Sequence, residues 1–173
     1  MPSLPPPESS RLLAGGPESL LEACRRDVRL AREAAARLSA LPAPAARDEA
    51  LELFDRAFAL LADAGARAGL ARNVHPDPAM RDAAEAAEQE VESAHAALSL
   101  DPGLYRALAA LDPGGADPAT GWLLQKSLRD FRRAGVDRDD ATRARVQALR
   151  EELTRIGQDF GRTIKDDVRS LRL

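Results

Sequence analysis

The chain has 173 residues, of which 45% are hydrophobic and only 3% aromatic, and its formal net charge is −3. Alanine and leucine supply most of the apolar residues and favour helix, whereas the β-branched and aromatic residues typical of strands are scarce. This balance predicts an all-α protein, and it excludes the strongly basic surface that a nucleic-acid-binding domain needs.

Residues 1–16 are rich in proline, serine and glycine, and we expect them to form a disordered N-terminal tail. They lack the charged start and apolar stretch of a secretory signal, and no apolar run reaches the roughly 20 residues of a membrane span. The single cysteine, Cys24, cannot form an internal disulfide, and we expect it to be a buried small apolar residue. These features predict a cytoplasmic protein with no membrane or nucleic-acid partner.

Residues 17–173 are divided by prolines into a predicted bundle of about six antiparallel helices. The first helix is expected over 17–41 and the second over 46–72, followed by a third that begins at Asp77-Pro78. Aspartate is a favoured helix N-cap and proline suits the first turn. Apolar residues at spacings of three and four predict the core faces of these helices. These faces are Leu21, Cys24, Val28, Ala31, Ala35 and Leu38; Leu51, Phe54, Phe58 and Leu61, with Leu53, Ala57, Leu60 and Ala64 beside them; and Met80, Ala84, Ala87, Val91, Ala94 and Leu98.

The Asp-Pro pair recurs at Asp101-Pro102 and Asp117-Pro118, where it predicts the starts of a short fourth helix and a fifth helix. The fourth helix carries Leu104, Tyr105, Leu108 and Leu111 as its apolar residues. Gly135 is suited to close the fifth helix, because a left-handed residue often follows the last helical turn.

The sixth helix has the most regular pattern of the chain, and Asp139 or Asp140 is expected to cap it. Glu151 and Arg155 are expected to pair on its solvent side. If its apolar face is buried, Leu153→Ala should cost about 2–5 kcal/mol, and we expect Phe160, like Phe131 of the fifth helix, to be buried. The pattern is generic for helix packing and indicates no function. The face consists of Val146, Leu149, Leu153, Ile156, Phe160 and Ile164.

His75-Pro76-Asp77 is the tripeptide that J-domain co-chaperones carry after a lysine-rich helix. Here the preceding helix is alanine-rich and has no lysine, and Val74 stands where a tyrosine is expected. The tripeptide alone is thus weak support for a J-like co-chaperone. This hypothesis predicts that the chain stimulates a chaperone ATPase through His75.

Glu92 and His95 have the Glu-x-x-His spacing of helical di-iron sites, but such sites need a second pair and two more glutamates. The chain has only two histidines, His75 and His95, so the HExxH pattern of zinc hydrolases is absent. We interpret His95 as an exposed residue on a glutamate-rich face, and Glu85, Glu88 and Glu92 as a solvated face. The glycine pairs 15–16 and 114–115 lack the spacing of a phosphate-binding loop, and no serine, threonine or cysteine lies in a recognisable nucleophile motif.

Several motifs in a fixed order resemble the N-terminal helical region of the M3 family of zinc metallopeptidases, which includes thimet oligopeptidase, neurolysin and oligopeptidase A. The resemblance covers about residues 51–167, more than half of the chain. One departure is Thr163, where the family usually has asparagine. The motifs are Asn73-Val74-His75-Pro76-Asp77 with Arg81-Asp82-Ala83, Ala87-Glu88-Gln89-Glu90-Val91, Leu104-Tyr105-Arg106-Ala107-Leu108, Leu128-Arg129-Asp130-Phe131-Arg132-Arg133-Ala134-Gly135, Leu149 to Leu153, and Gly157-Gln158-Asp159-Phe160 with Ile164 and Asp166.

The resemblance implies that residues 17–173 form a helical lobe, one wall of a channel through which short peptides reach a zinc site. The family's zinc ligands and HExxH motif would lie beyond Leu173, so we expect a chain truncated before the catalytic lobe and inactive alone. No catalytic, cofactor-binding or metal-binding residue is therefore assigned here, and zinc is expected only in the missing lobe, the chain's expected partner. The alternative is a stand-alone helical module that binds peptides or proteins, in which the docking face for a second lobe would have become polar.

Overall fold

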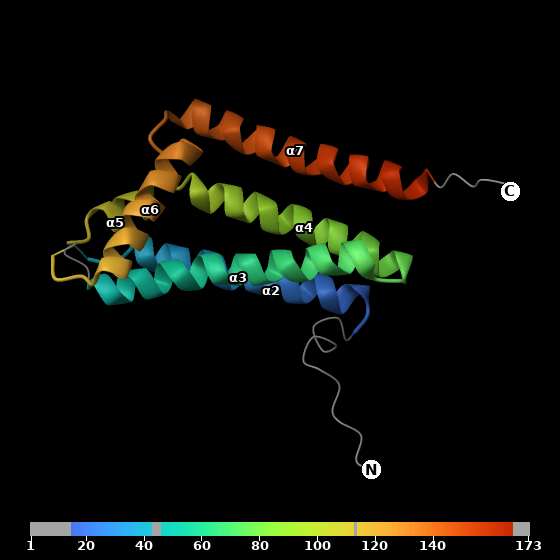
Figure 1. Cartoon of the computed structure of the whole chain (residues 1–173), viewed down its shortest axis with the longest axis horizontal. Coiled ribbons are helices and arrows are strands. Elements are labelled where there is room, and N and C mark those ends of the chain that lie inside the picture. The colour runs from blue at the N-terminus through green and yellow to red at the C-terminus, as the bar shows by residue number, and fades with distance from the viewer. Residues whose placement is uncertain (1–14, 43–45, 113, 168–173) are drawn as a thin grey trace, which may run out of the picture.

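The computed structural model describes residues 15–42, 46–112 and 114–167, and within these ranges it contains six helices and no strand. The predicted tail, residues 1–16, lies outside them except for Gly15 and Gly16. The all-α fold class is confirmed (Figure 1). The helices are α2 (Pro17–Ser39), α3 (Arg47–Val74), α4 (Pro78–Ser99), α5 (Pro102–Ala109), α6 (Pro118–Ala134) and α7 (Asp140–Asp166).

The predicted helix boundaries rest on side-chain caps that the structure confirms. Asp77 accepts a hydrogen bond from the backbone N–H of Ala79 at 3.0 Å, and Asp101 and Asp117 cap α5 and α6 in the same way. Asp139, not Asp140, caps α7, accepting from Thr142 N at 2.8 Å. Gly135 ends α6 with φ 102°, a left-handed conformation that glycine adopts without steric cost.

The core lies between α2, α3 and α4, which pack against one another along their whole length. Contacts such as Cys24 with Ala64, and Arg25 with Glu90, join these helices across the bundle. Alanine fills most of the buried positions of α2, α3 and α4, so the axes of these helices can approach closely. The predicted faces of α2 and α4 are buried, apart from partly buried Leu21.

The buried face of α3 is rotated about the helix axis relative to the predicted face. Leu53, Ala57, Leu61 and Ala64 meet the other helices, whereas three members of the expected main stripe are only partly buried. The reason is that small residues fill the tight three-helix contact, so the larger side chains lie at its edge. These edge residues are Leu51, Phe54 and Phe58.

A buried ion pair joins α2 to α3 inside this core. Asp27 Oδ2 lies 2.9 Å from Arg67 Nη1, and their side chains are 8% and 15% exposed. Beside them, the Cys24 thiol donates to the carbonyl oxygen of Ala64 at 3.7 Å. Burial raises the pKa of Cys24, against the opposing influence of Arg67. The prediction of a buried, unreactive cysteine agrees with this environment.

The last two helices are attached differently from the first three. Figure 1 shows α6 crossing the end of the bundle obliquely and α7 running back alongside α4. Successive long helices run in opposite directions in this view. Among the described helices, α7 packs chiefly on α4 and contributes little to the three-helix core.

Candidate functional site

Among the α7 residues whose side chains the structure describes, Gln158 is the most deeply buried, with 3% of its surface exposed. Its amide nitrogen donates to Glu88 Oε2 at 2.9 Å and to the backbone oxygen of Glu85 at 3.2 Å. Its amide oxygen accepts from Gln89 Nε2 at 2.6 Å. A buried polar side chain with these partners is satisfied, so it fixes which side of α7 meets α4.

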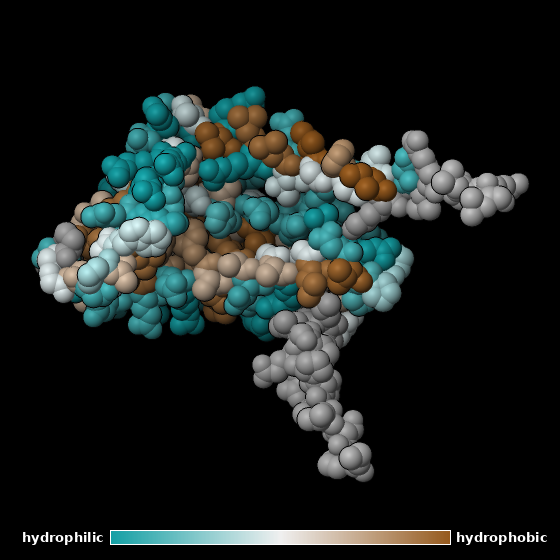
Figure 2. All heavy atoms as spheres, viewed as in Figure 1, coloured by the Kyte–Doolittle hydropathy of each residue, from teal (hydrophilic) through white to brown (hydrophobic). Residues whose placement is uncertain are grey.

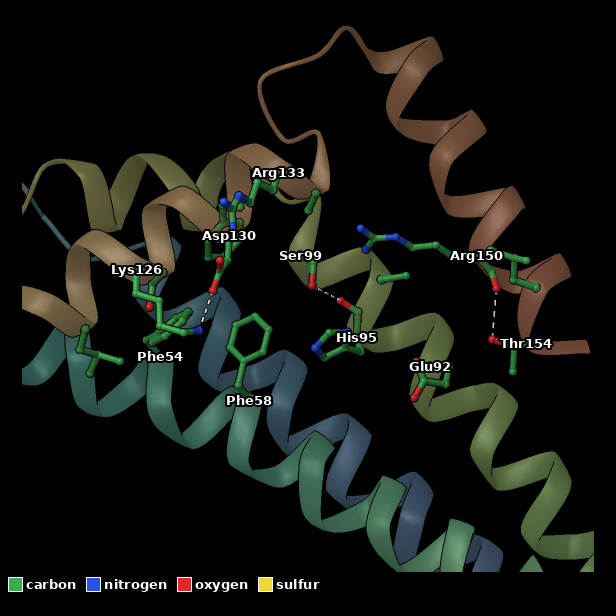
Figure 3. A pocket seen from close by; sticks show the side chains of 16 residues that line it. Phe54, Phe58, Glu92, His95, Ser99, Lys126, Asp130, Arg133, Arg150 and Thr154 are labelled. Carbon is green, nitrogen blue, oxygen red and sulfur yellow. Dashed lines mark hydrogen bonds and ion pairs between the residues drawn. The ribbon is translucent and has the colours of Figure 1, made fainter. Parts of the chain in front are cut away.

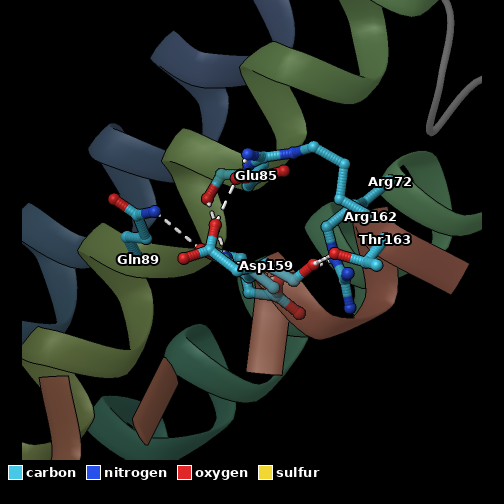
Figure 4. A network of polar contacts seen from close by, with 8 residues as sticks. Arg72, Glu85, Gln89, Asp159, Arg162 and Thr163 are labelled. Carbon is cyan, nitrogen blue, oxygen red and sulfur yellow. Dashed lines mark hydrogen bonds and ion pairs between the residues drawn. The ribbon is translucent and has the colours of Figure 1, made fainter. Parts of the chain in front are cut away.

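Further polar contacts continue along the same side of α7. Arg162 pairs with Glu85 (Figure 4). Ser93 Oγ donates to Glu151 Oε1 at 2.8 Å. Gln147 donates to the same Glu151 oxygen at 2.8 Å, and these hydrogen bonds lower the pKa of Glu151, Gln147 being the larger cause. The interface between α4 and α7 is therefore held mainly by amide, hydroxyl and charged groups.

Two expectations about these residues are wrong. Glu151 is partly buried and binds Ser93 instead of pairing on the solvent side with Arg155, whose Nε donates to the Glu151 backbone. Glu85 and Glu88 belong to the α4–α7 and α3–α4 contacts, and Glu88 lies 2.8 Å from Arg72 Nε. The physical reason is that α7 covers this side of α4, which sequence reasoning left open to solvent.

The apolar face of α7 points away from the bundle, on nearly the opposite side of the helix from Gln158 at about 100° per residue. The expectation that Phe160 is buried is therefore wrong, whereas Phe131 is buried as expected. Figure 2 shows apolar atoms along the outer side of α7. We call this set the α7 stripe, and it consists of Leu149, Leu153, Ile156, Phe160 and Ile164, which are 40%, 66%, 55%, 67% and 61% exposed.

A groove of about 760 Å³ lies between α4, α6 and α7 and is floored by α3 (Figure 3). Aromatic rings form its floor: the Phe54 and Phe58 centroids are 4.8 Å apart, and each lies 6.2 Å from that of Phe131. Leu153 of the α7 stripe lines the groove, so the two surfaces are continuous.

Charged side chains surround the groove. Lys126 Nζ lies 2.7 Å from Asp130 Oδ2, and this hydrogen bond is the main cause that lowers the pKa of Asp130. Arg133, Arg150 and Glu92 also line it. The groove thus combines an apolar floor with a polar rim, the usual composition of a site that binds small ligands.

The histidine motifs of the sequence are structural. His75 Nδ1 accepts from Asp77 N at 3.2 Å, and Asp77 caps α4. His95 is exposed, as expected, and its ring meets Phe58 edge-on at 5.7 Å beside the groove. Glu92 and His95 both line the groove, but no cluster of three metal-ligating side chains occurs among the described residues.

Gln158, Arg150 and the phenylalanine floor were not identified from the sequence as site residues. One signal for Gln158 was present in the sequence of α7. The solvent side of a surface helix usually carries charged residues. Uncharged Gln147, Thr154 and Gln158 occupy the side opposite the apolar stripe instead, which indicates that this polar side is in contact with another helix. None of the described helices is long and apolar enough to span a membrane.

No protein-family model matches this sequence. The chain is 33% identical over 152 residues to mitochondrial intermediate peptidase 1 of Cryptococcus neoformans var. neoformans serotype D (strain B-3501A). The match covers 83% of this chain but 20% of that protein, so the chain spans about one fifth of its relative's length. The chain is thus homologous to the N-terminal helical region of the M3 family of zinc metallopeptidases, as its motifs indicated.

Proposed function

We propose that this chain acts as the N-terminal helical lobe of a zinc metallo-oligopeptidase, with residues 17–173 forming one wall of the channel that admits short peptides. The catalytic lobe would supply zinc, which activates a water molecule for attack on the peptide bond. The described residues contain no cluster that fits zinc, so no catalytic step is assigned to them. Their role in this proposal is selection and scaffolding.

The observation that carries this proposal is the exposed α7 stripe. A large aliphatic or aromatic side chain gains about 1.5–3 kcal/mol when it is fully buried, so five of them on one helix side form a strong docking surface. The stripe is continuous with the groove and belongs to the helix that is joined to the bundle only on its polar side. A catalytic lobe packed on this stripe would bury it.

The second candidate is a stand-alone helical module that binds peptides or proteins, and the groove beside Phe58 favours it. A module adapted to work alone would carry polar residues where a second lobe would dock. The side chains of Leu153 and Phe160, 66% and 67% exposed, argue for the lobe instead.

The test is hydrolysis of a quenched fluorogenic peptide with added zinc. The chain alone should give no turnover, whereas the chain co-expressed with the remaining part of an M3 peptidase should give turnover that a chelator abolishes. Chelator-sensitive turnover by the chain alone would contradict the proposal. Equal activity of the remaining part of the M3 peptidase with and without this chain would also contradict it.

The cytoplasmic location also remains a proposal, supported by the composition of the chain. The relative, by its name, is a mitochondrial peptidase. Fractionation of cells that express the full gene product distinguishes the two compartments.

A further inference from the structure

Arg150 differs from every other partly buried arginine in the described part of the chain. Six arginines are partly buried, and five of them bind a carboxylate or a backbone carbonyl. The guanidinium of Arg150 has no such partner among the described residues. A partly desolvated cation without an anion is unfavourable, so this group is suited to receive one. The five paired arginines are Arg47, Arg67, Arg72, Arg81 and Arg143.

Arg150 lies at the groove between α4, α6 and α7. Figure 3 shows its side chain reaching from α7 towards α4, near His95 and Ser99. Arg133 of α6 lines the same groove, and its charge acts on Asp130 without a direct ion pair among the described residues. Lys126 and Asp130 neutralise each other at 2.7 Å, so the two arginines outweigh the single free acid, Glu92.

The size and floor of the groove limit what it can hold. Its volume of about 760 Å³ lies within the range of roughly 300–1,000 Å³ that is typical of sites for small ligands. Three of the four phenylalanines in the sequence, Phe54, Phe58 and Phe131, gather at its floor. Tilted and edge-on ring contacts there offer a surface for one more aromatic or large aliphatic group.

We propose that this groove binds the C-terminal end of a short peptide. The terminal aromatic or large aliphatic side chain packs on Phe54, Phe58 and Phe131. The free carboxylate accepts hydrogen bonds from the guanidinium of Arg150, with Arg133 adding positive charge. The inference rests on the proposed function, because it assigns a place on this lobe where a peptide is held.

A peptide end fits these features better than an acidic residue on the surface of a partner protein. A guanidinium presents two parallel N–H donors to a carboxylate, and a terminal carboxylate lies one bond from the Cα that carries the last side chain. The carboxylate and the last side chain of a peptide are thus only a few bonds apart. This short separation matches the groove, in which Arg150 lies beside the aromatic floor.

Calorimetric titration of the full chain with Ala-Ala-Ala-Phe tests the site, with the C-terminal amide of the same peptide as the matched ligand. We expect the free acid to bind at least about tenfold more tightly, the usual effect of one charge-assisted hydrogen-bonded pair. Arg150→Gln should abolish this preference. Arg145→Gln, an exposed arginine of the same helix outside the groove, should retain it.

Equal binding of acid and amide by the wild-type chain would overturn the inference, and this comparison needs no variant to fold. Retention of the preference in Arg150→Gln, with an unchanged circular-dichroism spectrum, would overturn it as well. Displacement of the peptide by laurate at equal or lower concentration would identify the site as one for fatty acids instead. The proposed function is tested by a separate experiment, in which association with a catalytic lobe is measured for variants of the α7 stripe. Loss of the acid-over-amide preference therefore contradicts only the peptide site, and loss of lobe association contradicts the proposed function.

Discussion

The amide of Gln158 on α7 donates a hydrogen bond to Glu88 Oε2 on α4 at 2.9 Å, in an environment where Gln158 is 3% exposed. Glu88 also lies 2.8 Å from Arg72 on α3, so one carboxylate connects three helices. Through this contact α7 meets the bundle with its polar side, and the apolar stripe is left facing outward.

Replacement of Gln158 with Ala should release α7 from α4. The change removes three hydrogen bonds that join α7 to α4, each worth about 0.5–1.5 kcal/mol. Amide hydrogen exchange should show lost protection in α7 with little change in α3. The control is Gln125→Ala, an exposed glutamine of α6. Unchanged protection of α7 would show that Gln158 does not hold the helix.

The docking of α7 should weaken in acid through Glu151. Hydrogen bonds from Gln147 and Ser93 lower its pKa below the ordinary 4.5 while α7 is docked. Gln147 lies on α7 itself, so its hydrogen bond stays with the released helix, whereas the bond from Ser93 of α4 is lost. The pKa of Glu151 is therefore lower in the docked than in the released helix, and the docking contribution of Glu151 is lost as the pH falls through the docked-state pKa. Amide exchange of α7 between pH 3 and 6 measures this. Ser93→Ala should flatten the pH dependence; an identical profile in that variant would contradict the assignment.

Truncation of the α7 stripe should hardly affect the stability of the isolated chain. Phe160→Ala and Leu153→Ala remove side chains that are two-thirds exposed, so each should cost less than about 1 kcal/mol. Leu61→Ala, at a residue 1% exposed in the three-helix core, should cost about 2–5 kcal/mol. Urea unfolding gives these values. A cost at Leu153 equal to that at Leu61 would mean that the stripe is buried in solution.

Removal of Asp27 should strongly destabilise the core, because it leaves the guanidinium of Arg67 partly buried and unpaired. The expected cost of Asp27→Ala is about 3–5 kcal/mol. The double variant Asp27→Ala/Arg67→Met should be less destabilised than Asp27→Ala alone, since the unpaired charge is gone. Thermal unfolding of the wild type, the two single variants and the double variant completes a double-mutant cycle. Additive losses of stability would exclude coupling between the two residues.

Local signals in the sequence were enough to place the helices. The Asp-Pro pairs at Asp77, Asp101 and Asp117 act through neighbouring backbone groups, so their effect can be inferred from adjacent residues. The apolar spacing of α4 likewise identified its buried side, because that helix lies within the core. These predictions depend on interactions within one or two helical turns.

The orientation of α7 could not be inferred in this way. Its apolar spacing predicts that Leu153 and Phe160 are buried, but not that this side of α7 is exposed among the described residues. Gln158 contacts α4 residues about 70 positions earlier in the chain, and Arg150 is distinguished only by the partners that it lacks. Such features depend on the relative placement of distant segments, which neither propensity nor periodicity encodes.

Sedimentation velocity of this chain mixed with the separately expressed remainder of an M3 peptidase tests most directly whether the α7 stripe docks a catalytic lobe. We expect a 1:1 complex with the wild-type chain. The double variant Leu153→Ser/Phe160→Ser should lose it while keeping the helix content and unfolding midpoint of the wild type. A complex that forms equally well with the double variant, or none with the wild-type chain, would contradict the account.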